Sequence, residues 1–559
     1  MVKWTKGRFQ LSGILLIAVL LRFYGVGFGL PHTECRPDET SLVYKALGFF
    51  SGDLNPHFFN YPSLYMYTLF VVYGVYFLSD YLLGFSTSDM LTEVILHPDR
   101  FILISRLLSA TLGSASVWMV YVISKRLLNV RTAKFAAFFS SVCYLHVRDS
   151  HFGTADVTMT FFILCSMYFI VEVYRTGSTL DYVLGGSFAG LATSTKYGGV
   201  LLVLPGVLAH VSHHAKLTTN PKSTASLLMN AFRSQKVWIF GISLILLFVI
   251  FTPFSVLDPT HFVADFKSEV LHLSRGHAEI SLERGWWVHL RYTLPYGMGL
   301  AMFIGSLAGI VVHAKKDGLQ ALILFSFPGV LFIFAGGGHT VFVRYMIPAL
   351  PFLCIGSAIC LIQLGNRISA LLPLLALVVA SQSIYYCISF DGLLAERDNR
   401  LLAADWINQH ASPGESIFHS STWGQAQIPP SLATLEKGYE ESRARGRQGR
   451  LLAATIAYYK SSGFSGGYQV KNQVDWDLSG EHPSYVLLYR SPLEAYNKVS
   501  ESLERIVEND YILAAKFENT AEPTNAHWFD QQDAFYIPYF GFSGFQRPGP
   551  SIYIYRKNS

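Results

Sequence analysis

The chain has 559 residues, of which 51% are hydrophobic, 15% aromatic and only 14% charged. Soluble proteins carry nearer ~25% charged residues, so this balance excludes an ordinary soluble globular protein. Many apolar runs are long enough to span a bilayer, which indicates a polytopic α-helical membrane protein. The net charge of +5 arises from basic residues in short loops between these runs, a pattern that orients membrane proteins rather than binding nucleic acid.

Hydropathy divides the chain into two predicted domains. Long apolar runs recur as far as about residue 390 and then stop. We therefore predict a transmembrane domain over residues 1–390 and a soluble domain over 391–559, a length that suits one domain. All six cysteines precede residue 391, so we expect no disulfide framework in the soluble domain.

The first apolar run, about residues 11–30, follows a basic N-terminus. Basic residues favour the cytoplasmic side, so we expect a cytoplasmic N-terminus and an uncleaved span that leads outward. A long outer loop, residues 31–100, follows. Its apolar stretch, Leu64 to Phe85, is predicted to lie along the interface or to be re-entrant, because a crossing there would place later basic loops outside.

Ten further apolar runs bring the predicted number of spans to eleven. With this count the polar turns and the soluble domain fall on the outer side. The further spans lie near residues 101–124, 134–147, 157–174, 180–195, 198–212, 237–252, 296–312, 319–335, 344–363 and 368–389.

The soluble domain mixes two kinds of pattern. Helix-like periodicity covers about residues 396–410, 431–460 and 492–508. Apolar, β-rich runs indicate strands. These runs are Ser416–Phe418, Tyr485–Tyr489, Tyr511–Phe517 and Ile552–Tyr555. The mixture predicts a small α/β domain.

Two adjacent carboxylates, Asp38 and Glu39, stand just after the first span, where acids are costly near lipid. One reading is structural: Pro37 begins a helix, and acids in a first turn complement the helix dipole. The other is functional: one carboxylate is a general base or a metal or substrate ligand, and Arg36 holds an anionic donor. Cys35 in the same turn is expected to be accessible from outside.

A second acid, Asp156, follows His151 in a turn between two predicted spans. Asp156 suits a helix cap, and a cap can also face a cavity. His151 alone is more readily explained as a structural or interfacial residue than as a ligand.

Two basic residues enter spans from the outer face. Lys196 stands between hydroxyl residues and two glycines, and Arg344 with Tyr345 follows a glycine-rich turn. Snorkelling at a helix end is the simple explanation for such a lysine. A fixed cation on this side would also suit a lipid phosphate.

The segment 253–295 is rich in acids and histidines, but no spacing matches a known metal motif. Walker and dinucleotide-binding glycine motifs are also missing from the sequence, so a nucleotide site has no support. A metal site is left open.

Several short motifs follow one another in the sequence and are predicted to share the outer side of the membrane. They are Asp38-Glu39, Asn60–Tyr65, Ser105–Ala110, His151–Asp156, Thr195–Tyr197 and Arg344-Tyr345. In these motifs and their order the sequence resembles the GT-C membrane glycosyltransferases, in particular the branch of protein O-mannosyltransferases and lipid A aminoarabinose transferases. The resemblance covers about residues 10–410.

The resemblance implies a GT-C fold and transfer of a sugar, with inversion, from a polyprenyl-phosphate donor to a lipid, glycan or protein acceptor on the extracytoplasmic face. It implies Asp38 as general base, Glu39 as its neighbour and Asp156 as a second acidic site. A divalent cation, Mg²⁺ or Mn²⁺, is possible in such enzymes. The substrate-binding residues it implies are Arg36, His57, Tyr61, His151, Lys196, Tyr197, Arg344 and Tyr345.

The absence of cysteine from residues 391–559 and the type of this domain favour a bacterial plasma (inner) membrane, with the soluble domain in the periplasm. Residues 391–559 differ from the β-trefoil insert of protein mannosyltransferases, which favours a lipid, glycan or other envelope acceptor. Two other functions compete. A transporter or lipid flippase would place polar residues at the midplane, often in paired repeats, which the sequence does not show. A non-catalytic envelope scaffold would not need Asp38.

Overall fold

The computed structural model describes residues 2–84, 89–217, 224–277, 280, 282–365, 369–421, 423–442, 447–463, 466–472, 482–520 and 527–558. The chain divides into two compact units. The helical unit comprises Met1–Val26, Lys45–Val72 and Ile104–Asp391. The sheet unit comprises Gly27–Tyr44, Tyr73–Leu103 and Gly392–Ser559. The predicted outer loop 31–100 is therefore shared between the two units.

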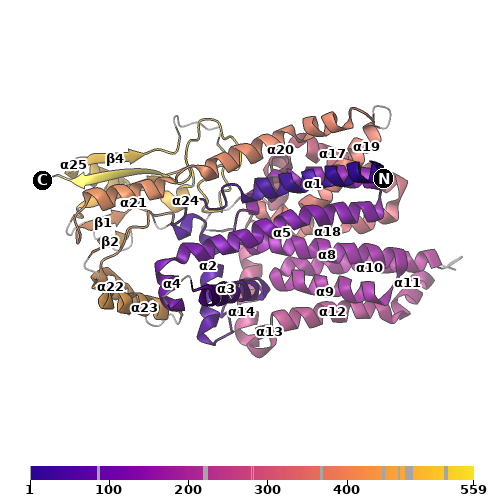
Figure 1. Cartoon of the computed structure of the whole chain (residues 1–559), viewed down its shortest axis with the longest axis horizontal. Coiled ribbons are helices and arrows are strands. Elements are labelled where there is room, and N and C mark those ends of the chain that lie inside the picture. Colours follow the sequence, from indigo (N-terminus) through magenta and orange to yellow (C-terminus); the bar gives the residue numbers. More distant parts are fainter. Residues whose placement is uncertain are drawn as a thin grey trace. The chain divides into compact units, whose positions relative to one another are not determined.

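The helical unit contains most of the helices, and Figure 1 shows two of them, α8 and α10, side by side and lengthwise. Its helices are α1 (Val2–Phe23), α6 (Val130–Ser141), α7 (Tyr144–Asp149), α8 (Ala155–Thr176), α9 (Thr179–Thr195), α10 (Val203–Leu217), α11 (Thr224–Arg233), α12 (Gln235–Phe251), α13 (Phe254–Leu257), α14 (Pro259–Arg275), α15 (Gly285–Val288), α16 (Leu294–Met298), α17 (Leu300–Lys316), α18 (Gly318–Gly336) and α19 (Leu350–Leu364). Tighter or wider helical turns are η2 (Phe49–Ser51), η3 (Tyr197–Leu202), η4 (His289–Thr293) and η5 (Val343–Ala349).

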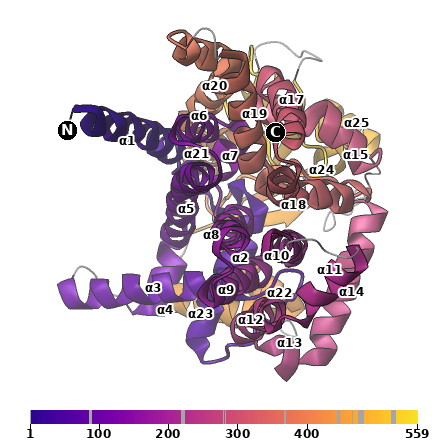
Figure 2. The same ribbon diagram turned by 90° about the vertical axis from the view of Figure 1, so that its right-hand side faces the viewer.

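Four helices begin in one unit and end in the other. They are α2 (Pro37–Gly48), α3 (Leu64–Leu83), α5 (Pro98–Leu127) and α20 (Leu372–Ala395). Figure 2 looks along α8 and α10 but shows α3 lengthwise, so residues 64–72 of the helical unit run across those helices. Leu64–Leu83 is also one of the helices that are long and apolar enough to cross a bilayer, so its interfacial or re-entrant placement stays a prediction.

In the described part of the chain, seven helices are long and apolar enough to cross a bilayer, or eight if the bent pair Gly285–Met298 and Leu300–Lys316 is one span. The multi-pass prediction is thus confirmed, but the count of eleven is not reproduced. Three of the predicted spans correspond to the short helices α6, α9 and α12, of 12, 17 and 17 residues.

Close packing of α9 against α12 depends on small residues. A Cβ atom added at Gly186 would lie 2.2 Å from the carbonyl oxygen of Phe240, and one at Gly190 would lie 2.5 Å from that of Leu244. Glycine lets the two backbones approach, as is usual between membrane helices. This packing fixes the end of α9, where Lys196 follows.

The sheet unit is built on five strands in the order β2-β1-β3-β5-β4. β1 is parallel to β2 and β3, whereas β5 is antiparallel to β3 and β4. The strands are β1 (Ser416–His419), β2 (Gln469–Asn472), β3 (Tyr485–Arg490), β4 (Tyr511–Phe517) and β5 (Ser551–Lys557). The other elements of the unit are η1 (Thr33–Cys35), α4 (Met90–Leu96), α21 (Asn399–His410), α22 (Leu432–Ser442), α23 (Arg447–Ser461), α24 (Glu494–Asn497) and α25 (Glu501–Asp510).

Helices cover both faces of the sheet. Alternate residues of a strand point to opposite faces; accordingly, Leu487 packs with Ile407 of α21, and Val486 packs with Val507 of α25. Figure 1 shows α21 and α25 beside the strands. The predicted C-terminal α/β domain is confirmed.

Candidate active site

A salt bridge joins two predicted site residues of the helical unit. Asp156 lies in the first turn of α8, where a carboxylate complements the helix dipole. Lys196 directly follows the end of α9. Its Nζ lies 2.6 Å from Oδ1 of Asp156. The lysine side chain is 18% exposed and the aspartate side chain 4%, so the pair is sheltered but within reach of solvent.

Two aromatic rings flank the lysine. The Nζ of Lys196 lies 5.4 Å from the ring centre of Tyr61 and 5.2 Å from that of Tyr345. A cation over a ring gains electrostatic energy from the ring's quadrupole. The fold thus brings together Tyr61, Asp156, Lys196 and Tyr345, four predicted residues that lie far apart in the sequence.

Tyr197 anchors the segment that carries Tyr61. Its hydroxyl donates a hydrogen bond to the carbonyl oxygen of Phe59 over 2.7 Å. The backbone N–H of Phe59 donates to Asp265 of α14 over 2.8 Å. The ring of Tyr197 packs edge-on against Phe266 of the same helix. Tyr197 therefore supports the cluster through the segment that contains Phe59.

Glu269 is a charged residue of this region that the sequence did not single out. Asn60 donates to its Oε2 over 3.3 Å, and Nδ1 of His272 lies 3.8 Å from the same oxygen. Burial raises the pKa of Glu269, but hydrogen bonds from His272 and Asn60 and the charge of Lys196 outweigh it. Its pKa therefore lies below the ordinary value, and Glu269 is a carboxylate at neutral pH.

A periodic signal identifies the face of α14 that carries Glu269. Phe262, Asp265, Phe266, Glu269 and His272 recur at the spacing of one helical face. Contacts with Phe59, Asn60 and Tyr197 come from this face.

Arg344 lies in η5, next to Tyr345, and only 5% of it is exposed. Its guanidinium carbon is 4.2 Å from the ring centre of Phe342. The ring of His277 packs against the ring of Phe342, with 5.2 Å between ring centres. A second cation thus sits beside the residue that flanks Lys196.

The two predicted histidines have different surroundings. His151 is fully buried, and its ring nitrogens lie 3.0 Å and 2.9 Å from the carbonyl oxygens of Val147 and Tyr24. These bonds support the structural alternative for His151. His57 is exposed and pairs with Asp53 over 3.0 Å.

The acidic turn lies in the sheet unit. Pro37 begins α2, as predicted, and Asp38 and Glu39 occupy its first turn. Glu39 is fully buried and Asp38 half-buried. Arg36, predicted to hold an anionic donor, is instead buried in an ion pair with Asp533. Cys35 is fully buried, so its expected accessibility is wrong.

Within the described ranges, no three His, Cys, Asp or Glu side chains are grouped so as to hold a metal ion.

The part of the chain that carries this cluster is similar in sequence to a known family. A family model for dolichyl-phosphate-mannose-protein mannosyltransferase matches residues 89–254, the part that contains Asp156 and Lys196. No curated protein matches the chain by sequence.

Solved membrane enzymes share the fold. ArnT from Cupriavidus metallidurans bound to undecaprenyl phosphate is similar with a TM-score of 0.52 and 13% identity, covering 97% of each chain. The apo state of ArnT gives 0.52 and 14%, covering 92% of this chain and 97% of that one. The Archaeoglobus fulgidus oligosaccharyltransferase tethered with an acceptor peptide gives 0.50 and 13%, covering 91% and 73%. The predicted GT-C fold and resemblance are confirmed.

Proposed function

We propose that this chain, which has the GT-C fold, is an integral-membrane glycosyltransferase that moves a sugar from a polyprenyl-phosphate-linked donor to an acceptor on the extracytoplasmic face. The observation that carries the proposal is the Lys196–Asp156 pair between the rings of Tyr61 and Tyr345. Both charged residues lie in the part matched by the mannosyltransferase family.

Lys196 is proposed to bind the donor phosphate. Its side chain is partly exposed and its ammonium group pairs with the carboxylate of Asp156, so a phosphate can replace or join that carboxylate. Positive charge at this place stabilises the phosphate as it leaves with the bonding electrons. Arg344, beside Tyr345, is proposed to add a second charge.

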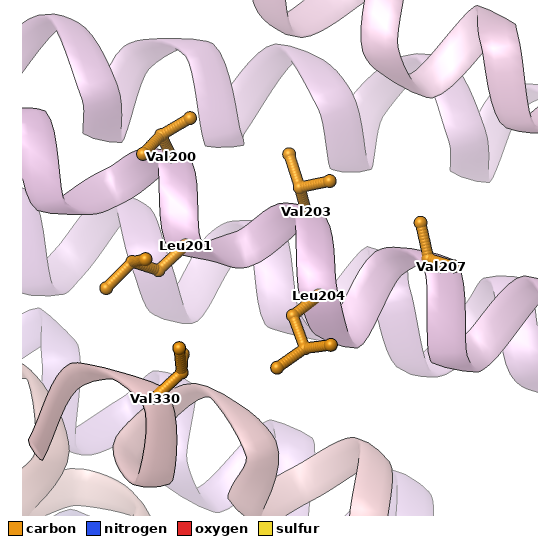
Figure 3. Close-up of a pocket in the computed structure, with 6 residues that line it drawn as sticks. All are labelled: Val200, Leu201, Val203, Leu204, Val207 and Val330. Atoms are coloured by element: carbon orange, nitrogen blue, oxygen red, sulfur yellow. The ribbon is translucent and has the colours of Figure 1, made fainter. Parts of the chain in front are cut away.

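An open apolar groove follows Lys196 along the chain and suits the prenyl tail. It has a volume of about 350 Å³ and is lined by Val200, Leu201, Val203, Leu204, Val207 and Val330. Figure 3 shows Leu201 and Leu204 on the side of their helix that faces Val330 of α18. The charged Lys196 and the first residue of this apolar groove, Val200, are four positions apart, which would match a ligand with a phosphate head and an apolar tail. The solved ArnT structure with undecaprenyl phosphate supports this donor class.

Asp38 is proposed to act as the general base, with Glu39 beside it in substrate binding. The acceptor hydroxyl oxygen bonds to the anomeric carbon of the sugar while the bond from that carbon to the donor phosphate breaks. The hydroxyl proton passes to the Asp38 carboxylate, and polyprenyl phosphate leaves with the electron pair. Attack opposite the leaving group inverts the anomeric centre. The α/β architecture of residues 391–559 favours an envelope lipid or glycan as acceptor.

A binding and transfer experiment tests the proposal. Purified protein is given undecaprenyl or dolichyl phosphate, and membranes are given a panel of radiolabelled polyprenyl-phosphate sugars. We expect wild type to bind the lipid phosphate and to transfer at least one sugar, whereas Lys196→Met weakens binding at least tenfold. Lys236→Met is the matched control, because its Nζ donates to the carbonyl oxygen of Gly177 and not to a carboxylate. Equal binding by both variants would overturn the donor assignment.

The proposed orientation places the N-terminus in the cytoplasm and residues 392–559 outside, in the periplasm. Single cysteines at the exposed positions Ser274 and Lys316 test it in a background without native cysteines. A membrane-impermeant thiol reagent on intact cells should label Ser274→Cys, in the outer segment 253–295, and not Lys316→Cys, at the end of α17. The reverse pattern would invert the orientation.

A further inference from the structure

The turn that carries Asp38 and Glu39 packs within the same compact unit as residues 392–559. Phe28 meets Phe535 edge-on, with ring centres 6.0 Å apart. His32 Nε2 lies 2.5 Å from the carbonyl oxygen of Gln425. Thr33 and the Gln427 amide exchange two hydrogen bonds, of 3.2 Å and 3.0 Å. The turn is thus joined to the C-terminal domain at several points.

The central contact is the ion pair of Arg36 with Asp533. The two side chains are only 1% and 5% exposed. The guanidinium carbon of Arg36 also lies 5.6 Å from the ring centre of Phe535. A buried charge pair tolerates little displacement, because separating the groups leaves charges in a medium of low polarity. The pair therefore fixes the position of Arg36 relative to residues 533–535.

The segment around Asp533 is itself fastened. The hydroxyl of Tyr496 donates to the carbonyl oxygen of Gln532 over 2.7 Å. The hydroxyl of Tyr536 donates to the carbonyl oxygen of Trp423 over 3.1 Å. Asp533 thus lies between Gln532 and Tyr536, each of which is hydrogen-bonded to another part of the domain.

The same turn also contacts a second buried ion pair, Asp398 with Arg400. Cys35 Sγ is 3.7 Å from Asp398, and Asp398 accepts hydrogen bonds of 2.8 Å and 2.7 Å from Arg400. Cys35 and Arg36 are adjacent, so two successive residues of the turn face buried ionic groups of the C-terminal domain.

The link from Arg36 to the carboxylates is short. Arg36 directly precedes α2, and its carbonyl oxygen accepts a hydrogen bond from the N–H of Glu39 over 3.1 Å. The hydroxyl of Thr40 donates to the carbonyl oxygen of Thr33 over 3.1 Å. These bonds connect the first turn of α2 to η1 without a flexible spacer, so a movement of Arg36 turns the Asp38 and Glu39 side chains.

We infer that Arg36 and Asp533 form a positioning pair through which the C-terminal domain sets the orientation of the Asp38 and Glu39 carboxylates. The inference rests on the proposed role of Asp38 as general base. It gives the C-terminal domain a role in turnover and gives Arg36 a positioning role in place of donor binding.

Kinetics of Asp533→Asn in the full-length protein test the pair. We expect kcat to fall by about tenfold to a hundredfold, since small misplacements of a reacting group cost this much. The donor KM and the Kd for undecaprenyl phosphate should stay within twofold. Backbone amides of residues 33–40 should exchange hydrogen faster. A wild-type kcat, or a raised donor KM with unchanged kcat, would overturn the inference.

Two further variants separate positioning from folding. Tyr511→Phe removes a buried hydrogen bond of the same domain, from its hydroxyl to the carbonyl oxygen of Pro483 over 2.8 Å, and should leave kcat unchanged. The double variant Arg36→Met with Asp533→Leu replaces both charges with apolar groups. It should regain thermal stability relative to Asp533→Asn while its kcat stays low. Recovery of kcat together with stability would show that the pair only supports folding.

Failure of the proposed function gives a different result. If wild type transfers no sugar and Asp38→Asn behaves as wild type in every assay, the glycosyltransferase proposal fails. The hydrogen-exchange comparison still tests the docking: unchanged exchange over residues 33–40 in Asp533→Asn would overturn the pair even then.

Discussion

The Asp156–Lys196 pair of the helical unit and the Arg36–Asp533 pair of the sheet unit are both salt bridges, but they differ in what surrounds them. Lys196 is 18% exposed and its ammonium group lies between two tyrosine rings. Arg36 is 1% exposed. A partly exposed lysine can exchange one anion for another, whereas a buried guanidinium keeps its partner.

This difference in exposure explains why two basic residues, Lys196 and Arg36, are assigned different roles. Lys196 is a compact charge on a flexible stem, which suits a phosphate that arrives and leaves. Arg36 is a planar group held by Asp533 and by the ring of Phe535. The first pair is suited to binding a ligand, and the second to holding a nearby carboxylate in place.

The largest expected effect is on kcat. It comes from replacing Asp38 of the sheet unit, whereas replacing Lys196 of the helical unit should affect donor binding. Asp38→Asn should lower kcat by about 10²–10⁴-fold, because it removes a general base, and should change the donor KM only slightly. Lys196→Met should mainly weaken binding of undecaprenyl phosphate. Steady-state transfer and lipid binding measure both. If both variants raise KM alone, the distinction between the two pairs is wrong.

The two salt bridges should also differ in how much each contributes to the free energy of unfolding. Asp533→Ala removes the carboxylate from a buried guanidinium and should lower the free energy of unfolding by about 3–5 kcal/mol. Asp156→Ala leaves a lysine that can turn toward solvent and should cost ~1 kcal/mol. Thermal unfolding in detergent, with hydrogen exchange to assign each unit, measures the losses. Equal losses would show that exposure does not distinguish the pairs.

Sequence patterns predict one pair better than the other. Asp156 and Lys196 stand out because each is a charge at the end of an apolar run, and the sheet strands stand out because they are aliphatic. Asp533 gives no such signal, since it lies 497 residues from Arg36 and pairs with it only through tertiary packing. Glu269 was missed because its helix is polar overall, although its face recurs at helical spacing. β2 was missed because its four residues, Gln469–Asn472, include no long apolar run.

A pH dependence should mark the junction of the turn with the C-terminal domain. Burial, with a smaller effect of the Arg400 charge, lowers the pKa of His32 to about 4. The unfolded state, with an ordinary histidine pKa near ~6.5, then binds more protons between these values. Stability is full above pH ~6.5 and falls as the pH drops toward 4, by about 2 kcal/mol between pH 7.5 and 5.

His32→Gln isolates this contribution, because glutamine can still donate to the carbonyl oxygen of Gln425. The unfolding temperature of the variant should change less than that of wild type between pH 7.5 and 5. Parallel curves would place the acid-sensitive group elsewhere in the sheet unit, where His419 is also buried with a pKa lowered to about 3.

The smallest expected effect is a change in lipid-phosphate binding when Glu269, the second carboxylate near Lys196, is replaced. Glu269→Gln keeps an oxygen that can accept the hydrogen bond of Asn60 and removes one negative charge. Because that charge opposes an arriving phosphate, the variant should bind undecaprenyl phosphate about two- to fivefold more tightly at low salt, and the gain should shrink as salt screens it. Since the pKa of Glu269 lies below its ordinary value, the gain should be constant above pH ~5. Weaker binding would mean that Glu269 serves to hold Asn60 and the neighbouring Tyr61 in place, and that Lys196 owes its selectivity for phosphate to its rings and to Asp156.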